Sequence, residues 1–333
     1  MADLATTYLG LSLRNPLLAS ASPLTGDIAA LRALEDHGVA AVVLPSLFEE
    51  DISRDQRELE SLLDAGEGLA EVCGGFFPTV HADQGVVERY LALIADARSA
   101  VDIPVIASLN GATDAGWIEL ARLLEQAGAS AVELNLYHLP LNLTQSAVAV
   151  ERDARAMVGR VRDAIDVPLA VKLNPYYSAF GEMATTLEAA GADALVLFNR
   201  LYHPDIDPLR LCEIHDVELS RRYEMRLPMM WLAALRGRVS VSLAGSTGVE
   251  TGDDLVRYLL VGADAVMSTS ALLRHGVAYA ACLLGTLTEW LDSRGFTDVD
   301  DIRGLLAQPD DNEINARERA AYRCELHRYQ DSR

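Results

Sequence analysis

Lys172 is the first residue of this sequence that suggests chemistry. It lies inside the apolar segment Leu169–Asn174, between Val171 and Leu173. If that segment is a buried strand, the ammonium group costs several kcal/mol unless it meets an anion. A structural ion pair with Glu133 or another carboxylate is one solution, and an anionic ligand is the other. We favour a ligand, because the surroundings of Lys172 are otherwise apolar.

Three asparagines end other apolar segments in the same way. They are Asn110, Asn135 and Asn199. Any one of them can simply cap a loop with its amide group. If the segments are neighbouring strands, the three amides and Lys172 form a polar cup of fixed donors and acceptors.

Two turns rich in glycine and serine suggest phosphate binding. One follows the segment Val239–Ala244 and reads Gly245-Ser-Thr-Gly-Val-Glu-Thr-Gly252; the other follows Ala265–Ser268 and reads Thr269-Ser-Ala271. Each turn precedes an expected helix and offers bare backbone N–H groups beside its start, which is how chains bind phosphate. Two such turns in succession match the phosphate site that (β/α)₈ barrels place after strands 7 and 8.

A repeated pattern predicts the strands that would position these groups. Gly38, Gly128, Gly191 and Gly262 each end a helical stretch and precede an apolar segment, as glycine at a left-handed helix cap does. The predicted strands are Leu17–Ser22, Ala41–Ser46, Val105–Asn110, Ala131–Leu136, Leu169–Asn174, Ala194–Asn199, Val239–Ala244 and Ala265–Ser268. Near-continuous apolar strands are buried on both faces and therefore parallel. We predict an α/β fold, a (β/α)₈ barrel, rather than an open sheet, whose first strand would carry a dinucleotide fingerprint.

The remaining segments decorate this barrel. Thr6–Leu13 predicts an N-terminal hairpin, and long insertions after strands 2 and 6 (48–85 and 201–227) predict lids or substrate walls. Two outer helices are predicted within 298–328, at 298–306 and 315–328. We expect residues 1–333 to form a single domain.

Composition limits the partners. The chain has 333 residues, half of them hydrophobic, and a net charge of −21, which argues against nucleic acid or an anionic membrane as the main partner. The N-terminus lacks the features of a signal peptide and no apolar run is long enough to span a membrane, so a cytoplasmic location is expected. The four cysteines are scattered without a CxxC pair, which predicts free thiols and no metal site.

Together these motifs resemble the dihydroorotate dehydrogenase family, most closely its soluble class 1 branch. The segments that carry the resemblance are Asn15–Ser22, Glu133–Leu136, Val171–Tyr176, Gly248–Gly252 and Ser268–Ala271. The resemblance implies a barrel that binds flavin mononucleotide (FMN). It also implies oxidation of dihydroorotate to orotate in pyrimidine biosynthesis, or of a related CH–CH substrate, by hydride transfer to flavin N5.

Carried over position by position, the resemblance assigns the flavin contacts. The ring is lined by Ser20, Ala21 and Ser22, and its polar edge is held by Ser46, Ser108, Asn135 and Lys172. Lys172 also stabilises negative charge on the reduced ring. The phosphate is cradled by Gly245, Ser246, Gly248, Thr269 and Ser270.

The substrate side departs from the family pattern. Pro45 stands where the family has a lysine, and His138 stands where class 1 has its catalytic cysteine. Histidine can act as a base near neutral pH, so His138 is the candidate base, with a solvated loop histidine as the alternative. The candidate substrate residues are Asn110, Asn135, Asn199 and Arg200.

Two other functions stay open. A barrel that keeps the flavin and phosphate site but has lost dihydroorotate chemistry would act as a binding or partner protein. A phosphosugar aldolase with Lys172 as a Schiff base is the other. Class 1 relatives imply a homodimer or a separate electron-transfer partner.

Overall fold

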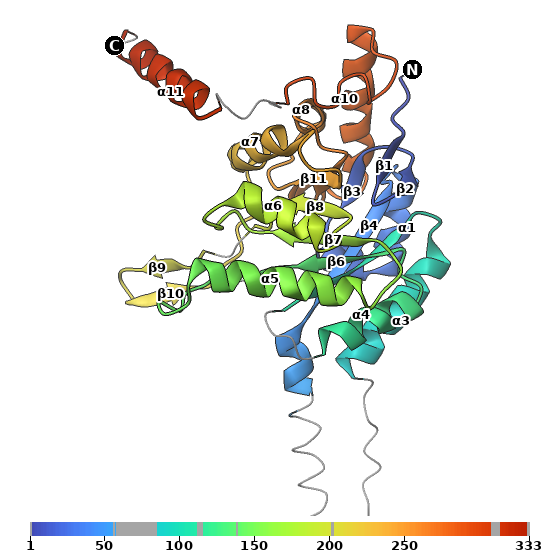
Figure 1. Ribbon diagram of the computed structural model, residues 1–333. Coiled ribbons are helices and arrows are strands. Elements are labelled where there is room, and N and C mark those ends of the chain that lie inside the picture. The colour runs from blue at the N-terminus through green and yellow to red at the C-terminus, as the bar shows by residue number, and fades with distance from the viewer. Residues whose placement is uncertain are drawn as a thin grey trace, which may run out of the picture.

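Parallel strands close into a barrel in the computed structural model (Figure 1), which describes residues 2–55, 57, 85–111, 116–137, 139–200, 203–307 and 314–331. The barrel order is β11–β12–β3–β4–β5–β6–β7–β8, with parallel neighbours throughout. The strands are β3 (Leu17–Ala19), β4 (Ala41–Phe48), β5 (Val105–Asn110), β6 (Ala131–Asn135), β7 (Leu169–Leu173), β8 (Ala194–Leu197), β11 (Ser242–Ser246) and β12 (Ala265–Ser268). The predicted (β/α)₈ barrel is confirmed.

One predicted strand begins too early. β11 begins at Ser242 rather than at Val239, because the N–H groups of Arg238 and Val239 still bond the carbonyl of Leu235. The chain is therefore still in the turn that leaves α7 (Arg226–Leu235).

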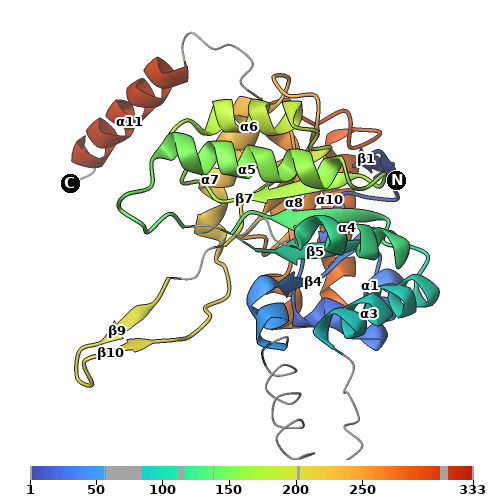
Figure 2. The ribbon, with the colours of Figure 1, turned by 60° about the horizontal axis from the view of Figure 1, so that its bottom comes forward.

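Helices surround the barrel (Figures 1 and 2). They are α1 (Ile28–Asp36), α3 (Val86–Ala100), α4 (Trp117–Gln126), α5 (Ala147–Arg162), α6 (Phe180–Ala189), α7, α8 (Gly252–Leu260), α9 (Ser270–His275) and α10 (Tyr279–Arg294). The glycines that end four of the helical stretches have positive φ angles, which are 99°, 97°, 98° and 106° at Gly38, Gly128, Gly191 and Gly262. These left-handed positions explain why glycine recurs there.

The C-terminal prediction is partly wrong. Residues 298–306 form turns instead of a helix, since the N–H groups of Gly304 and Leu306 bond the carbonyls of Leu259 and Leu260 at the end of α8. The second predicted helix exists as α11 (Ile314–Asp331). However, α11 stands apart from the barrel (Figure 1) and its side chains at 319–328 are exposed, so the packing that we expected for it is not seen.

The N-terminal hairpin fills the end of the barrel at which the strands begin. It is the antiparallel pair β1 (Thr6–Tyr8) and β2 (Leu11–Leu13), as predicted. Tyr8, Leu9 and Leu13 share one buried cluster with small inward-facing residues: Ala41, Ala131, Ala170, Ala194, Ala244 and Ala265. Alanine at these positions leaves the space that the hairpin occupies. The opposite end, where the strands finish, is left for polar side chains.

The two insertions differ in what the structure describes. After β8, β9 (Asp205–Asp207) and β10 (Cys212–Ile214) form an antiparallel hairpin that projects from the barrel in both ribbon views (Figures 1 and 2). Most of the insertion after β4, including Cys73, lies outside the described residues.

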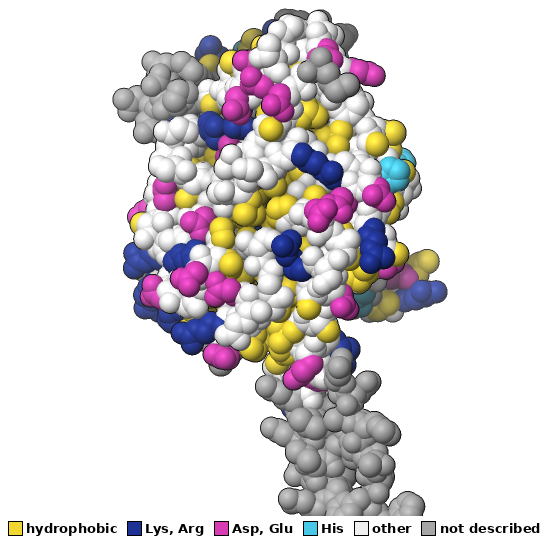
Figure 3. Space-filling model, turned by 90° about the vertical axis from the view of Figure 1, so that its right-hand side faces the viewer, with side chains coloured by type: hydrophobic (Ala, Val, Ile, Leu, Met, Phe, Trp, Pro, Cys, Tyr) yellow, Lys and Arg dark blue, Asp and Glu magenta, His cyan; other side chains and the backbone are white. Residues whose placement is uncertain are grey.

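Acidic and basic side chains are interspersed over the face in Figure 3. Within the described ranges, every helix is too short or too polar to cross a bilayer.

Candidate active site

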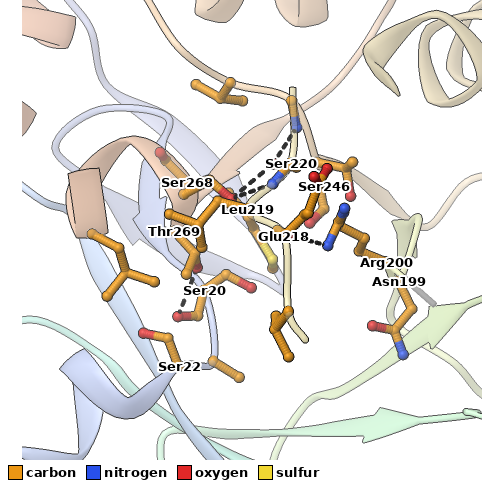
Figure 4. Close-up of a pocket in the computed structure, with 18 of the residues that line it drawn as sticks. Ser20, Ser22, Asn199, Arg200, Glu218, Leu219, Ser220, Ser246, Ser268 and Thr269 are labelled. Carbon is orange, nitrogen blue, oxygen red and sulfur yellow. Dashed lines mark hydrogen bonds between the residues drawn. The ribbon is translucent and has the colours of Figure 1, made fainter. Parts of the chain in front are cut away.

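A cavity of about 290 Å³ opens where the barrel strands end (Figure 4). We call it the barrel-mouth cavity. Its lining includes predicted cofactor residues from four strand ends: Ser20, Ala21, Ser22, Lys172, Ser246, Gly248, Thr269 and Ser270. Asn199 and Arg200, predicted to bind substrate, also line it. The structure therefore brings together residues that are as far apart in the sequence as Ser20 and Ser270.

Lys172 stands in this cavity and is also ion-paired. Its Nζ atom is 3.1 Å from Ser20 Oγ and 3.3 Å from Glu133 Oε1. Glu133 is fully buried and Lys172 is 6% exposed. The two solutions for a buried lysine are thus combined, because the same ammonium group has a carboxylate partner and faces a cavity.

Asn135 lies beside Lys172, and the other two asparagines lie beside Asn135. Asn135 pairs in register with Asn110 on β5 and with Lys172 on β7. Asn199 donates a 2.6 Å hydrogen bond from Nδ2 to Asn135 Oδ1. The β8 end is therefore tied directly to the β6 end.

Four predicted cofactor residues do not line the cavity: Ser46, Ser108, Asn135 and Gly245. Ser46 and Ser108 bond each other through their hydroxyl groups at 2.8 Å. Gly245 makes room for Tyr258, since a Cβ atom there would lie 2.4 Å from the tyrosine ring. The Tyr258 hydroxyl donates to the carbonyls of Ser246 and Thr247, both at 2.8 Å. Gly245 thereby allows Tyr258 to support the first phosphate-type turn from behind.

Both phosphate-type turns are shaped by their own backbone. Thr247 and Gly248 have positive φ angles of 82° and 77°, and Thr247 Oγ1 donates to the Phe198 carbonyl at 3.1 Å. In the second turn, Thr269 Oγ1 donates to the Ser20 carbonyl at 3.2 Å, and α9 begins at the next residue. Ser268 Oγ is buried without a hydrogen-bond partner in the described part of the chain.

Sequence reasoning missed Ser220, which joins the two turns. Its hydroxyl oxygen accepts from the Gly248 N–H at 3.1 Å and lies 2.8 Å from Ser270 Oγ. Arg274 holds the same segment by donating to the carbonyls of Leu219 (3.1 Å) and Ser220 (2.8 Å). Ser220 belongs to the insertion 201–227, which the sequence predicts to be a lid or substrate wall, and only its place between the hairpin and α7 could have signalled this contact.

Arg200 is engaged by the β8 insertion. Its Nε atom is 3.1 Å from Glu224 Oε1, and its Nη1 donates to the Glu218 carbonyl (Figure 4). A second cavity, which we call the insertion cavity, is lined by Tyr137, Arg200, His203, Asp205, Asp216, Val217 and Glu218. The candidate base His138 follows Tyr137 but lies outside the described residues, so its role stays a prediction.

Comparison with known proteins adds relatives of this chain. The family model described as dihydroorotate dehydrogenase matches residues 80–291. The dihydroorotate dehydrogenase B (NAD(+)) catalytic subunit of Thermoplasma acidophilum is 26% identical over 309 residues, 92% of this chain and 99% of that protein. The dihydroorotate dehydrogenase A (fumarate) of Lactobacillus delbrueckii subsp. bulgaricus is 25% identical over 89% of this chain and 95% of its own length. A subunit of NAD-dependent dihydropyrimidine dehydrogenase from Escherichia coli K12 is 22% identical over 91% and 76%.

Proposed function

Because this chain belongs to the dihydroorotate dehydrogenase family, we propose that it is an FMN-dependent oxidoreductase that oxidises a CH–CH bond of a dihydropyrimidine-type substrate. The observation that carries the proposal is one cavity that joins Lys172 to both phosphate-type turns. A cation at one end and backbone donors at the other suit a ligand with an electron-accepting ring and a phosphate.

The residues of the barrel-mouth cavity fit FMN. Ser20, Ala21 and Ser22 would line the ring, and Lys172 would face its polar edge. The phosphate would take donors from the turns at Ser246–Gly248 and Thr269–Ser270, with Gly245 as support from behind. The buried Ser268 hydroxyl, which has no partner among the described residues, is a polar group that such a ligand could satisfy. Ser46, Ser108 and Asn135 would shape the polar edge from the β4, β5 and β6 ends.

Bound FMN supplies a hydride acceptor, and the remaining work falls to the protein. Lys172 would stabilise negative charge that develops on the ring. Asn110, Asn135, Asn199 and Arg200 would hold the substrate, consistent with the hydrogen bond between Asn135 and Asn199. His138, in the loop after β6, would take the substrate proton.

The substrate is either dihydroorotate or an uncharged relative. The insertion cavity carries the carboxylates of Asp205, Asp216 and Glu218, while the Arg200 guanidinium is already bonded to Glu224 and Glu218. Nearby carboxylates disfavour the carboxylate of dihydroorotate, although exposed charges are weakened by salt. This observation favours an uncharged dihydropyrimidine.

The assembly proposed with this function is a homodimer in the cytoplasm or a catalytic subunit with a separate electron-transfer partner. Two of the relatives support the second form, because their names describe them as subunits of NAD-linked enzymes.

Anaerobic titration of the FMN-loaded protein tests the proposal. Dihydroorotate and dihydrouracil are added separately, and flavin absorbance is followed. We expect at least one of them to bleach the flavin, and dihydrouracil to do so better. Bound FMN that no dihydropyrimidine reduces would instead favour the binding-protein alternative, and borohydride trapping on Lys172 would favour the aldolase.

A further inference from the structure

Lys172 differs from every other cationic side chain of this protein. The 333 residues contain one lysine and 27 arginines. Among the described residues, the other ion pairs use the arginine fork, apart from that of His215 with Glu213, and a compact ammonium group is used at this single place. Its position on β7, at the floor of the barrel-mouth cavity, is where charge on a ligand ring would be felt.

Glu133 is the carboxylate that determines how much of this charge reaches the cavity. It is fully buried on β6, and its Oε1 atom is 3.3 Å from Lys172 Nζ. Its Oε2 atom has no hydrogen-bond partner among the described residues. The negative charge of Glu133 therefore has Lys172 as its main compensation.

The surroundings show that this charge acts over a distance. Burial raises the pKa of Tyr8 well above its usual range, and the charges of Glu133 and Asp264 raise it further. Burial also raises the pKa of Tyr90, and Glu133 again contributes. Charges interact more strongly in such a buried setting than in water.

The buried ion pair between Glu133 and Lys172 is not explained by stability alone. Well-packed apolar residues of similar volume often stabilise a protein as much as a buried ion pair does. Here the pair is asymmetric, because Lys172 lines the cavity and Glu133 lies behind it. Of the two side chains, only the ammonium group of Lys172 can therefore contact a ligand in the cavity directly.

We propose that Glu133 is a positioning residue that holds Lys172 at the cavity floor and offsets its charge, so that it sets the relative affinity of the site for oxidised and reduced FMN. This inference rests on the proposed FMN function. Reduced flavin carries additional negative charge, and a site with an uncompensated Lys172 would bind it more tightly. Glu133 would therefore keep the flavin reduction potential lower than Lys172 alone would set it.

Glu133→Gln tests this, since it removes the charge and keeps the shape. The dissociation constants of oxidised and reduced FMN are measured for both proteins, together with the midpoint potential. We expect the affinity ratio to shift at least tenfold toward reduced FMN, which is about 30 mV for a two-electron couple. Glu133→Asp, which restores a carboxylate, should return part of the shift.

The Lys172→Met background shows whether Glu133 acts through Lys172. In that background, Glu133→Gln should change the affinity ratio of reduced to oxidised FMN less than threefold. The double variant retains neither charge, so it can still be measured if Glu133→Gln alone does not fold. An equal shift in both backgrounds, or no shift in the wild-type background, overturns the inference while FMN binding stands. Wild-type protein that takes up no FMN overturns the proposed function and this inference together.

Discussion

Lys172→Met should destabilise the protein even when no ligand is bound. Methionine fills a similar space but leaves the fully buried Glu133 carboxylate without the ammonium group that lies 3.3 Å away. Removing one partner of a buried ion pair leaves an uncompensated charge, which costs about 3–5 kcal/mol. The free energy of unfolding of the ligand-free protein should fall by that amount.

Two further variants separate this effect from general disturbance. Arg152→Met removes the cation of an exposed ion pair, in which Arg152 and Asp153 lie 2.8 Å apart and their side chains are 65% and 56% exposed. This variant should lose at most about 1 kcal/mol of unfolding free energy. The double variant Glu133→Gln, Lys172→Met leaves no unpaired charge and should recover most of the loss.

Urea unfolding of the four proteins without FMN is the assay. The expected order of stability places Lys172→Met well below the other three. If Lys172→Met lies within about 1 kcal/mol of wild type, the Glu133 charge is accommodated without Lys172 and the reasoning about the buried pair is refuted.

Further predictions concern the turns, the candidate base and Tyr177. Ser220→Ala should weaken FMN binding about tenfold, because the hydroxyl group that joins the Gly248 N–H to Ser270 Oγ is lost and the two phosphate-type turns are no longer held together; fluorescence titration measures this, with Ser99→Ala on the surface of α3 as the control. Gly245→Ala should cost about 1–3 kcal/mol in unfolding free energy by displacing Tyr258, and an unchanged urea midpoint would contradict this. His138→Ala should slow flavin reduction by a factor of about 10²–10⁴ without altering FMN affinity, as stopped-flow mixing would show; an unchanged rate leaves His138 without a role. Burial, and to a lesser extent the charge of Glu151, raises the pKa of Tyr177 to about 12. The stability that this group contributes below pH 10 should therefore be lost as pH rises toward about 12. Tyr177→Phe should remove this fall of the unfolding free energy with pH.

The barrel was predictable because its signals are local. Continuous apolar strands and the glycines with positive φ, such as Gly191 and Gly262, mark each unit without reference to the rest of the fold. The turns that begin at Gly245 and Thr269 are also marked locally, by their small residues, and residues of both turns line the barrel-mouth cavity. The start of β11 was misplaced because hydrogen bonds to Leu235 extend a turn that composition does not mark.

The parts that could not be predicted depend on contacts distant in sequence. Residues 298–306 look amphipathic, yet the backbone N–H groups of Gly304 and Leu306 bond the carbonyls of Leu259 and Leu260. Ser220 reaches Gly248 and Ser270 only because the β8 insertion folds back over the cavity. For Lys172, the sequence left open whether its partner is a carboxylate or a ligand, and only the geometry shows that it both bonds a carboxylate and lines a cavity.

The absorption spectrum of the purified protein, recorded before and after anaerobic addition of a dihydropyrimidine, tests the proposed FMN-dependent oxidation. We expect bound FMN, released as FMN on denaturation, whose oxidised absorbance is bleached by dihydrouracil or dihydroorotate. A protein that stays colourless and takes up no added FMN would contradict it.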